Sequence, residues 1–109
     1  MRDDEVWVVL CTAPNDEVAD RLARGLVEAR LAACVNILPA VRSVYRWKDE
    51  VTVDAEVQLV IKTTRWRFDA LASFLRAEHP YELPEIVALR AADGNPAYLE
   101  WVARETTAG

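Results

Sequence analysis

Hydrophobic and polar positions follow two different periods along this chain of 109 residues, and these periods predict its secondary structure. The continuous apolar run at residues 6–10 is typical of a β-strand that is buried on both faces. Apolar residues then recur at helical spacing to about Arg30, which predicts an amphipathic helix. Asn15 precedes this helix and is expected to cap it, with Asp16 and Glu17 at the end of the helix dipole that favours negative charge.

The next two segments alternate between apolar and polar residues, the second more regularly than the first. Residues 35–48 and 51–62 therefore predict two strands that form a β-hairpin. Pro39 cannot donate a backbone hydrogen bond, so it indicates an edge strand or a bulge in the first of them. Its alternation places Val35, Ile37, Val41, Tyr45 and Trp47 on one face.

The last third of the chain predicts three more elements. A second helix is expected over residues 65–78, with Thr64 as its cap. Residues 84–91 are expected to form a strand. Asn95 and Pro96 are typical of a helix start, because proline is tolerated at the first helical position.

The order of elements is β-α-β-β-α-β-α, which predicts an α+β protein. Two split βαβ units with right-handed crossovers give a ferredoxin-like sandwich, in which an antiparallel sheet of strand order 4-1-3-2 carries helices on one face. One such domain is expected to occupy residues 1–109.

The predicted hairpin is too long for a domain of this size. Its strands of about 12 to 15 residues would span roughly 40 to 50 Å, whereas a compact chain of this length has a radius of gyration near ~13 Å. The distal part must project beyond the helices and would expose an apolar patch. We expect self-association through this patch, with Tyr45, Trp47, Val51 and Val53 as interface residues.

Composition excludes several classes of function. The net charge of −5 argues against a nucleic-acid partner, because phosphate contacts need an excess of Lys and Arg. The start of the chain is acidic and lacks the apolar segment of a signal peptide. The apolar run at residues 6–11 is far shorter than the ~20 residues of a membrane span. We therefore expect a cytoplasmic protein with no membrane contact.

Five motifs in the chain resemble one known family. They are "LAACVNILP" (31–39), "SVYRWKDEV" (43–51), "EVQLVIKTT" (56–64), "HPYELPEIVAL" (79–89) and "NPAYLEWV" (95–102). In this order they are similar to the CutA family of divalent-cation tolerance proteins. The resemblance implies a cytoplasmic homotrimer with an architecture similar to PII signalling proteins. It also implies a role in tolerance to copper and other divalent metals, and in animal members the anchoring of acetylcholinesterase, but no catalytic activity.

His79 is the only histidine and admits two interpretations. It falls at a predicted helix end, where it can bond the last carbonyl groups and suit the helix dipole. Imidazole is also the commonest metal donor, and His79 lies inside a motif that carries the resemblance. Tyr81 and Glu85 are near enough to assist.

The two cysteines are expected to be free thiols. Cys11 and Cys34 belong to strands that the 4-1-3-2 order separates by another strand, a distance of ~9.6 Å, which is beyond disulfide reach. They are either buried small hydrophobes or soft metal donors. Glu56 and Lys62 fall on the polar face of one strand and either are solvated or line a pocket between subunits.

A metal site within one chain is not expected, because no closely spaced group of cysteine and histidine ligands occurs. Any copper(II) binding is predicted to lie between subunits or weakly at the surface, with His79 as the main nitrogen donor and Glu85 or Tyr81 assisting. Cys34 would prefer copper(I). The alternative is a PII-like trimer that binds a small ligand or docks a partner without a metal role. Catalysis is not expected, since no residue is placed to act as a base beside Cys34.

Overall fold

The computed structural model describes residues 3–107, so the chain ends at residues 1–2 and 108–109 of the expected domain lie outside the described part. Seven elements occur in the expected order. They are β1 (Val6–Ala13), α1 (Asp16–Glu28), β2 (Cys34–Trp47), β3 (Glu50–Thr64), α2 (Arg65–Glu78), β4 (Val87–Arg90) and α3 (Pro96–Glu105). The predicted α+β, ferredoxin-like arrangement is confirmed.

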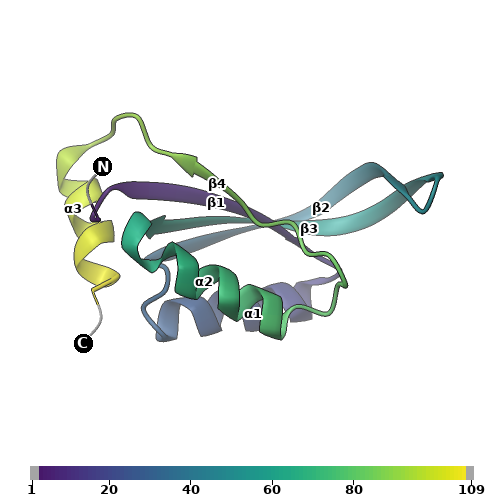
Figure 1. The fold of residues 1–109 in the computed structure, drawn as a ribbon, viewed down its shortest axis with the longest axis horizontal. Helices are drawn as coiled ribbons and strands as arrows, with labels where there is room; N and C mark the ends of the chain where they lie inside the picture. The colour runs from purple at the N-terminus through teal and green to yellow at the C-terminus, as the bar shows by residue number, and fades with distance from the viewer. Residues whose placement is uncertain (1–2, 108–109) are drawn as a thin grey trace.

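The strands form one antiparallel sheet in the order β2-β3-β1-β4, which is the predicted order read from the other edge. Helices α1 and α2 lie side by side against one face of the sheet (Figure 1). Helix α3 lies at the end of the sheet opposite to the β2–β3 hairpin (Figure 1). None of the helices in residues 3–107 is long and apolar enough to cross a membrane.

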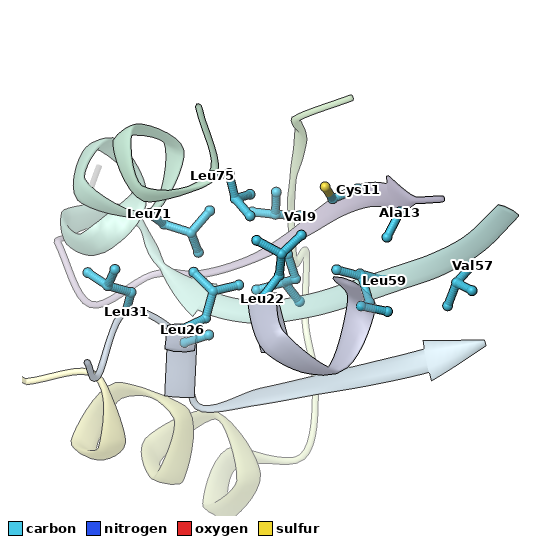
Figure 2. Close-up of a cluster of buried hydrophobic side chains, with 13 residues drawn as sticks. Val9, Cys11, Ala13, Leu22, Leu26, Leu31, Val57, Leu59, Leu71 and Leu75 are labelled. Carbon is cyan, nitrogen blue, oxygen red and sulfur yellow. The ribbon is translucent and has the colours of Figure 1, made fainter. Parts of the chain in front are cut away.

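The hydrophobic core lies between α1, α2 and the face of the sheet that they cover (Figure 2). Alternate residues of the central strands point into it, because side chains alternate between the two faces of a strand. These strand residues are Val9, Cys11, Ala13, Val57, Leu59 and Ile61. Leu22, Leu26, Leu71 and Leu75 meet them from the helices and are fully buried. The predicted helical period therefore identified the buried face of both helices.

The caps of the helices follow the prediction in two cases out of three. The Asn15 side chain accepts a hydrogen bond from the Val18 backbone N–H at 2.9 Å, and Asn95 caps α3 in the same way. Thr64 occupies the cap position of α2 but makes no capping bond. Its hydroxyl lies 3.1 Å from the Thr106 hydroxyl in a buried contact, which ties β3 to the end of α3.

The last strand is shorter than predicted. Residues 84–91 were expected to be extended, but β4 contains only Val87–Arg90. Pro80 and Pro84 lack the backbone N–H that a sheet ladder requires. The segment between α2 and β4 thus forms a loop that wraps around the end of β1 at the base of the hairpin (Figure 1).

A bulge in β2 overturns the predicted arrangement of its faces. Pro39 and Ala40 stand opposite a single residue of β3, Val57, between the pairs Leu38–Gln58 and Val41–Glu56. Ala40 adopts a φ of 61°, a left-handed conformation found at some bulges. The predicted bulge is confirmed, but the extra residue reverses the alternation beyond it. Consequently Val41, Tyr45 and Trp47 share the face of Glu56, opposite to the core face of Val35 and Ile37.

The hairpin projects beyond the helices, as its length predicted (Figure 1). Strands β2 and β3 have 14 and 15 residues, and the molecule measures 43 Å along its longest axis. Its radius of gyration of 14.3 Å exceeds the ~13 Å of a compact chain of this length. Val44 and Val51 are 68% and 65% exposed, and Val53, Tyr45 and Trp47 are also exposed.

Both cysteines are free, and β3 separates their strands as predicted. Cys11 is completely buried in the core, where burial raises the pKa of its thiol to about 12. Cys34 is partly exposed on the opposite face of the sheet, and its thiol is within hydrogen-bonding reach of the Tyr98 hydroxyl on α3.

These positions predict different thiol reactivities. Because Cys11 is buried and its raised pKa keeps the thiol protonated near neutral pH, we expect this residue to remain unlabelled by an alkylating reagent until the protein unfolds. Cys34 is expected to react first. Mass spectrometry of peptides after timed labelling, with and without denaturant, measures both rates. Labelling of Cys11 in the native protein at the rate of Cys34 would contradict the buried position.

Candidate functional site

A cavity of about 860 Å³ lies at the base of the projecting hairpin. Its walls come from β2 residues 43–47 and from the loop residues 81–87, while Thr12 and Glu56 contribute from β1 and β3. Cavities of this size are typical of small-molecule sites. The bulge contributes to this site, because it turns Tyr45 and Trp47 onto the face that carries Glu56.

His79 anchors the loop that forms one wall of the cavity. The residue is buried with 7% of its surface exposed, at the C-terminal end of α2. Its ring Nε2 lies 2.7 Å from the Thr12 carbonyl oxygen, and its Nδ1 accepts a hydrogen bond from the Tyr81 N–H at 3.1 Å. Both contacts are made at once by a neutral ring with its proton on Nε2. His79 therefore joins the end of α2 to β1 and fixes the start of the loop.

Tyr81 extends from this anchored loop to Glu56. Its hydroxyl donates a hydrogen bond to Glu56 Oε2 at 2.5 Å, and its ring lies beside that of His79 with 4.7 Å between centroids. Burial, followed by the bond to Glu56, raises the pKa of Tyr81. Tyr45 makes a similar bond to Asp54, which raises the pKa of Tyr45. Two tyrosine–carboxylate pairs thus occur on one face of the hairpin base.

The structure separates several residues that the sequence offered as partners. Glu56 is only 9% exposed, so it is not part of a solvated face. Lys62 lies near the other end of β3, where its ammonium group bonds the Asn36 side chain, and it does not line the cavity. Glu85 is an exposed residue on the cavity wall. Cys11 belongs to the core and Cys34 to the far end of β2, so neither lines the cavity.

The candidate metal ligands are not brought together. In residues 3–107 no group of three His, Cys, Asp or Glu side chains is arranged to hold a metal ion. A copper ion at either nitrogen of His79 would have to displace the Thr12 carbonyl or the Tyr81 N–H. The geometry thus favours the interpretation of His79 as a structural residue over its prediction as the main copper donor. Its partner is a carbonyl of β1, however, and not one of the last carbonyls of its helix.

A second surface was not recognised from the sequence. The face of the sheet away from α1 and α2 carries a row of apolar side chains from all four strands. Leu89, Val87 and Leu38 are 51%, 48% and 43% exposed on it. Half-buried residues of the central strands adjoin them, namely Val8, Leu10 and Val60. The continuous apolar run of the first strand was the available signal, because it predicted burial on both faces.

The open face of the sheet and one side of the hairpin are the same face of the strands. Tyr45 and Trp47 lie on this face with Leu38 because of the bulge, and Gln58, Glu56 and Asp54 of β3 are its polar residues beside them. Val51 and Val53 lie on the reverse side of the hairpin, beyond the helices. The four predicted interface residues therefore belong to two faces.

Comparison with known proteins finds relatives that match most of the chain. The family model described as "CutA1 divalent ion tolerance protein" matches residues 7–105. The chain is 54% identical over 100 residues to a divalent-cation tolerance protein CutA of Thermus thermophilus, with 92% of this chain and 96% of that protein covered. It is 47% identical to the human protein CutA, covering 93% of this chain but only 56% of the human protein.

Solved structures show the same fold. A divalent cation tolerance protein from Thermus thermophilus superposes with a TM-score of 0.92 at 51% identity, covering 94% of this chain and 99% of that one. CutA1 from Oryza sativa gives a TM-score of 0.92 at 44% identity, with 96% of both chains covered. From the matched family model, these identities and the shared fold, the chain belongs to the CutA1 family of divalent ion tolerance proteins.

Proposed function

We propose that this protein acts in divalent-cation tolerance as a cytoplasmic, non-enzymatic homotrimer. The observation that carries the oligomer is the set of exposed large apolar residues on the open face of the sheet and on the projecting hairpin. Membership of the family supports the role in tolerance. The number of three subunits comes from the family resemblance, because an apolar face indicates association but not its stoichiometry.

The energetic argument for association is direct. Exposed large apolar residues occur on both faces of the hairpin and on the open face of the sheet, and monomers rarely expose large apolar patches. Burial of this surface in a trimer would stabilise the assembly by roughly 25 cal/mol for each Å² removed from water. The hairpin projects beyond its own helices (Figure 1), which leaves it available for contact with a neighbouring subunit.

Metal ions are proposed to bind to the assembled trimer. One chain offers a single histidine whose ring nitrogens both have partners, and two thiols on separate strands. Copper contact would therefore be made at exposed carboxylates such as Glu85, or between subunits, where each ligand is repeated by symmetry. The PII-like alternative of a small-ligand trimer is favoured by a different observation, the cavity at the hairpin base.

Trp47→Asp tests the assembly. Light scattering of the unmodified protein at micromolar concentration should give three times the chain mass of 12.3 kDa. The aspartate would place a charge in an apolar interface, at a desolvation cost of several kcal/mol, so we expect monomer or aggregate. Trp66→Asp is the matched control, because Trp66 is equally exposed but lies on α2. A monomeric unmodified protein, or a trimeric Trp47→Asp variant, contradicts the proposed interface.

The same pair of variants tests the tolerance role. In cells that lack this protein, the unmodified gene and Trp66→Asp are expected to restore growth under copper stress, while Trp47→Asp is not. Equal copper sensitivity with and without the unmodified gene would remove the proposed role, whatever the oligomeric state.

His79→Ala separates a structural histidine from a copper ligand. We expect the variant to lose about 2 kcal/mol of unfolding free energy, because two buried hydrogen bonds disappear. Its copper dissociation constant should stay within about twofold of that of the unmodified protein. Chemical denaturation and a copper titration of the trimer measure the two quantities. A large loss of copper affinity with unchanged stability would restore His79 as the main donor.

A further inference from the structure

Glu56 is a buried carboxylate without a cationic partner. Its residue is only 9% exposed, and within residues 3–107 no ion pair involves it. Buried carboxylates are normally paired with a cation or fully hydrogen-bonded, because an ionised group loses its hydration on burial. In this part of the chain the Tyr81 hydroxyl bonds Oε2, and no hydrogen bond to Oε1 is found. Because no buried side-chain oxygen in the described residues lacks a partner, Oε1 is open to solvent in the cavity.

The carboxylate lies in the wall of the cavity at the hairpin base, together with three aromatic side chains. Tyr45 and Trp47 come from β2, and Tyr81 comes from the loop after α2. Aromatic faces attract cations through the negative potential above the ring. The indole of Trp47 already shows this preference, since the Lys48 ammonium nitrogen lies 5.8 Å from its centroid.

The charges around the cavity point to the same class of ligand. Glu82 and Glu85 line it with Glu56, and Arg46 is the cationic residue among the lining side chains. This excess of carboxylates disfavours a phosphate or another anion. A divalent metal ion needs several oxygen ligands close together, and no such group is present in residues 3–107. One open carboxylate oxygen beside aromatic rings fits a single ammonium group on an organic stem.

We propose that this cavity binds a small organic molecule with a protonated primary amine. The ammonium group donates a hydrogen bond to Glu56 Oε1, and its apolar stem lies against Tyr45 and Trp47. The Tyr81 hydroxyl occupies Oε2, which leaves Oε1 for the ligand. His79 acts one step further away by fixing the Tyr81 backbone. The proposal does not depend on any metal role. Because Trp47 also belongs to the proposed interface, the site would lie at the edge between subunits.

Butylammonium near neutral pH is the probe, measured on the assembled protein by NMR chemical-shift titration. We expect saturable shifts of the Trp47 indole and Tyr81 signals. Glu56→Gln should weaken binding about tenfold or more, because a charge-assisted hydrogen bond is lost. Asp69→Asn is the charge-matched control, since it removes an exposed carboxylate on α2, away from the cavity, and should leave the dissociation constant unchanged.

Two further probes separate the contribution of the ammonium group from that of the apolar stem. Tetramethylammonium carries the charge without an N–H donor, and butanol carries the stem without the charge; both should bind more weakly than butylammonium. If butanol binds as tightly as butylammonium, the cavity recognises only the apolar stem and not the ammonium group, and the proposal is overturned. Glu56-dependent binding of magnesium or copper ions that displaces butylammonium would also overturn it, in favour of a metal site.

Tyr81→Phe provides a test that does not require loss of the buried carboxylate. Removal of the phenol hydroxyl frees Glu56 Oε2 without changing the shape of the ring, so butylammonium is expected to bind at least as tightly. Loss of binding in Tyr81→Phe, or unchanged binding in Glu56→Gln, would show that Glu56 is not the recognition group. Neither result bears on copper tolerance, so this proposal and the proposed function can fail separately.

Discussion

The unequal lengths of the paired strands determine most features of this molecule. The central strand β3 pairs with β1 through residues 57–64 only, whereas its residues 50–56 pair with β2 alone. Helices α1 and α2 cover the sheet where β1 is present and end at the base of the hairpin (Figure 1). Beyond that point the strands have no layer of their own chain to pack against. The exposed apolar hairpin and the cavity at its base both follow from this mismatch.

Two local devices convert the base of the hairpin into a defined site. The bulge at Pro39 and Ala40 turns the aromatic residues of β2 onto the face of Glu56. The loop after α2 is then attached to β1 through His79, which places Tyr81 over the same carboxylate. The site needs both the bulge and the attached loop, because neither the strand nor the loop alone surrounds Glu56.

The tolerance proposal and the amine-binding proposal rest on different observations. The tolerance role rests on family membership and on the assembly that the open face of the sheet favours. The cavity chemistry rests on a single buried carboxylate and its aromatic neighbours. A trimer that binds a small amine and a trimer that limits metal toxicity are compatible, although Tyr45, Trp47 and Glu85 belong to both proposals.

The sequence by itself determined the order of the elements and the length of the hairpin, because hydrophobic periods and cap residues act locally, although it made the last strand too long. The sheet topology followed from the handedness of the crossovers. Glu56, Tyr81 and His79 could be named from the sequence, but their grouping could not. His79 bonds a carbonyl that is 67 residues away in the chain, and no local pattern encodes such a contact. Pro39 signalled a bulge without showing how many residues it contained, yet one extra residue reverses every later side chain. Only the tertiary structure therefore decided which face the aromatic residues occupy and which groups surround the buried carboxylate.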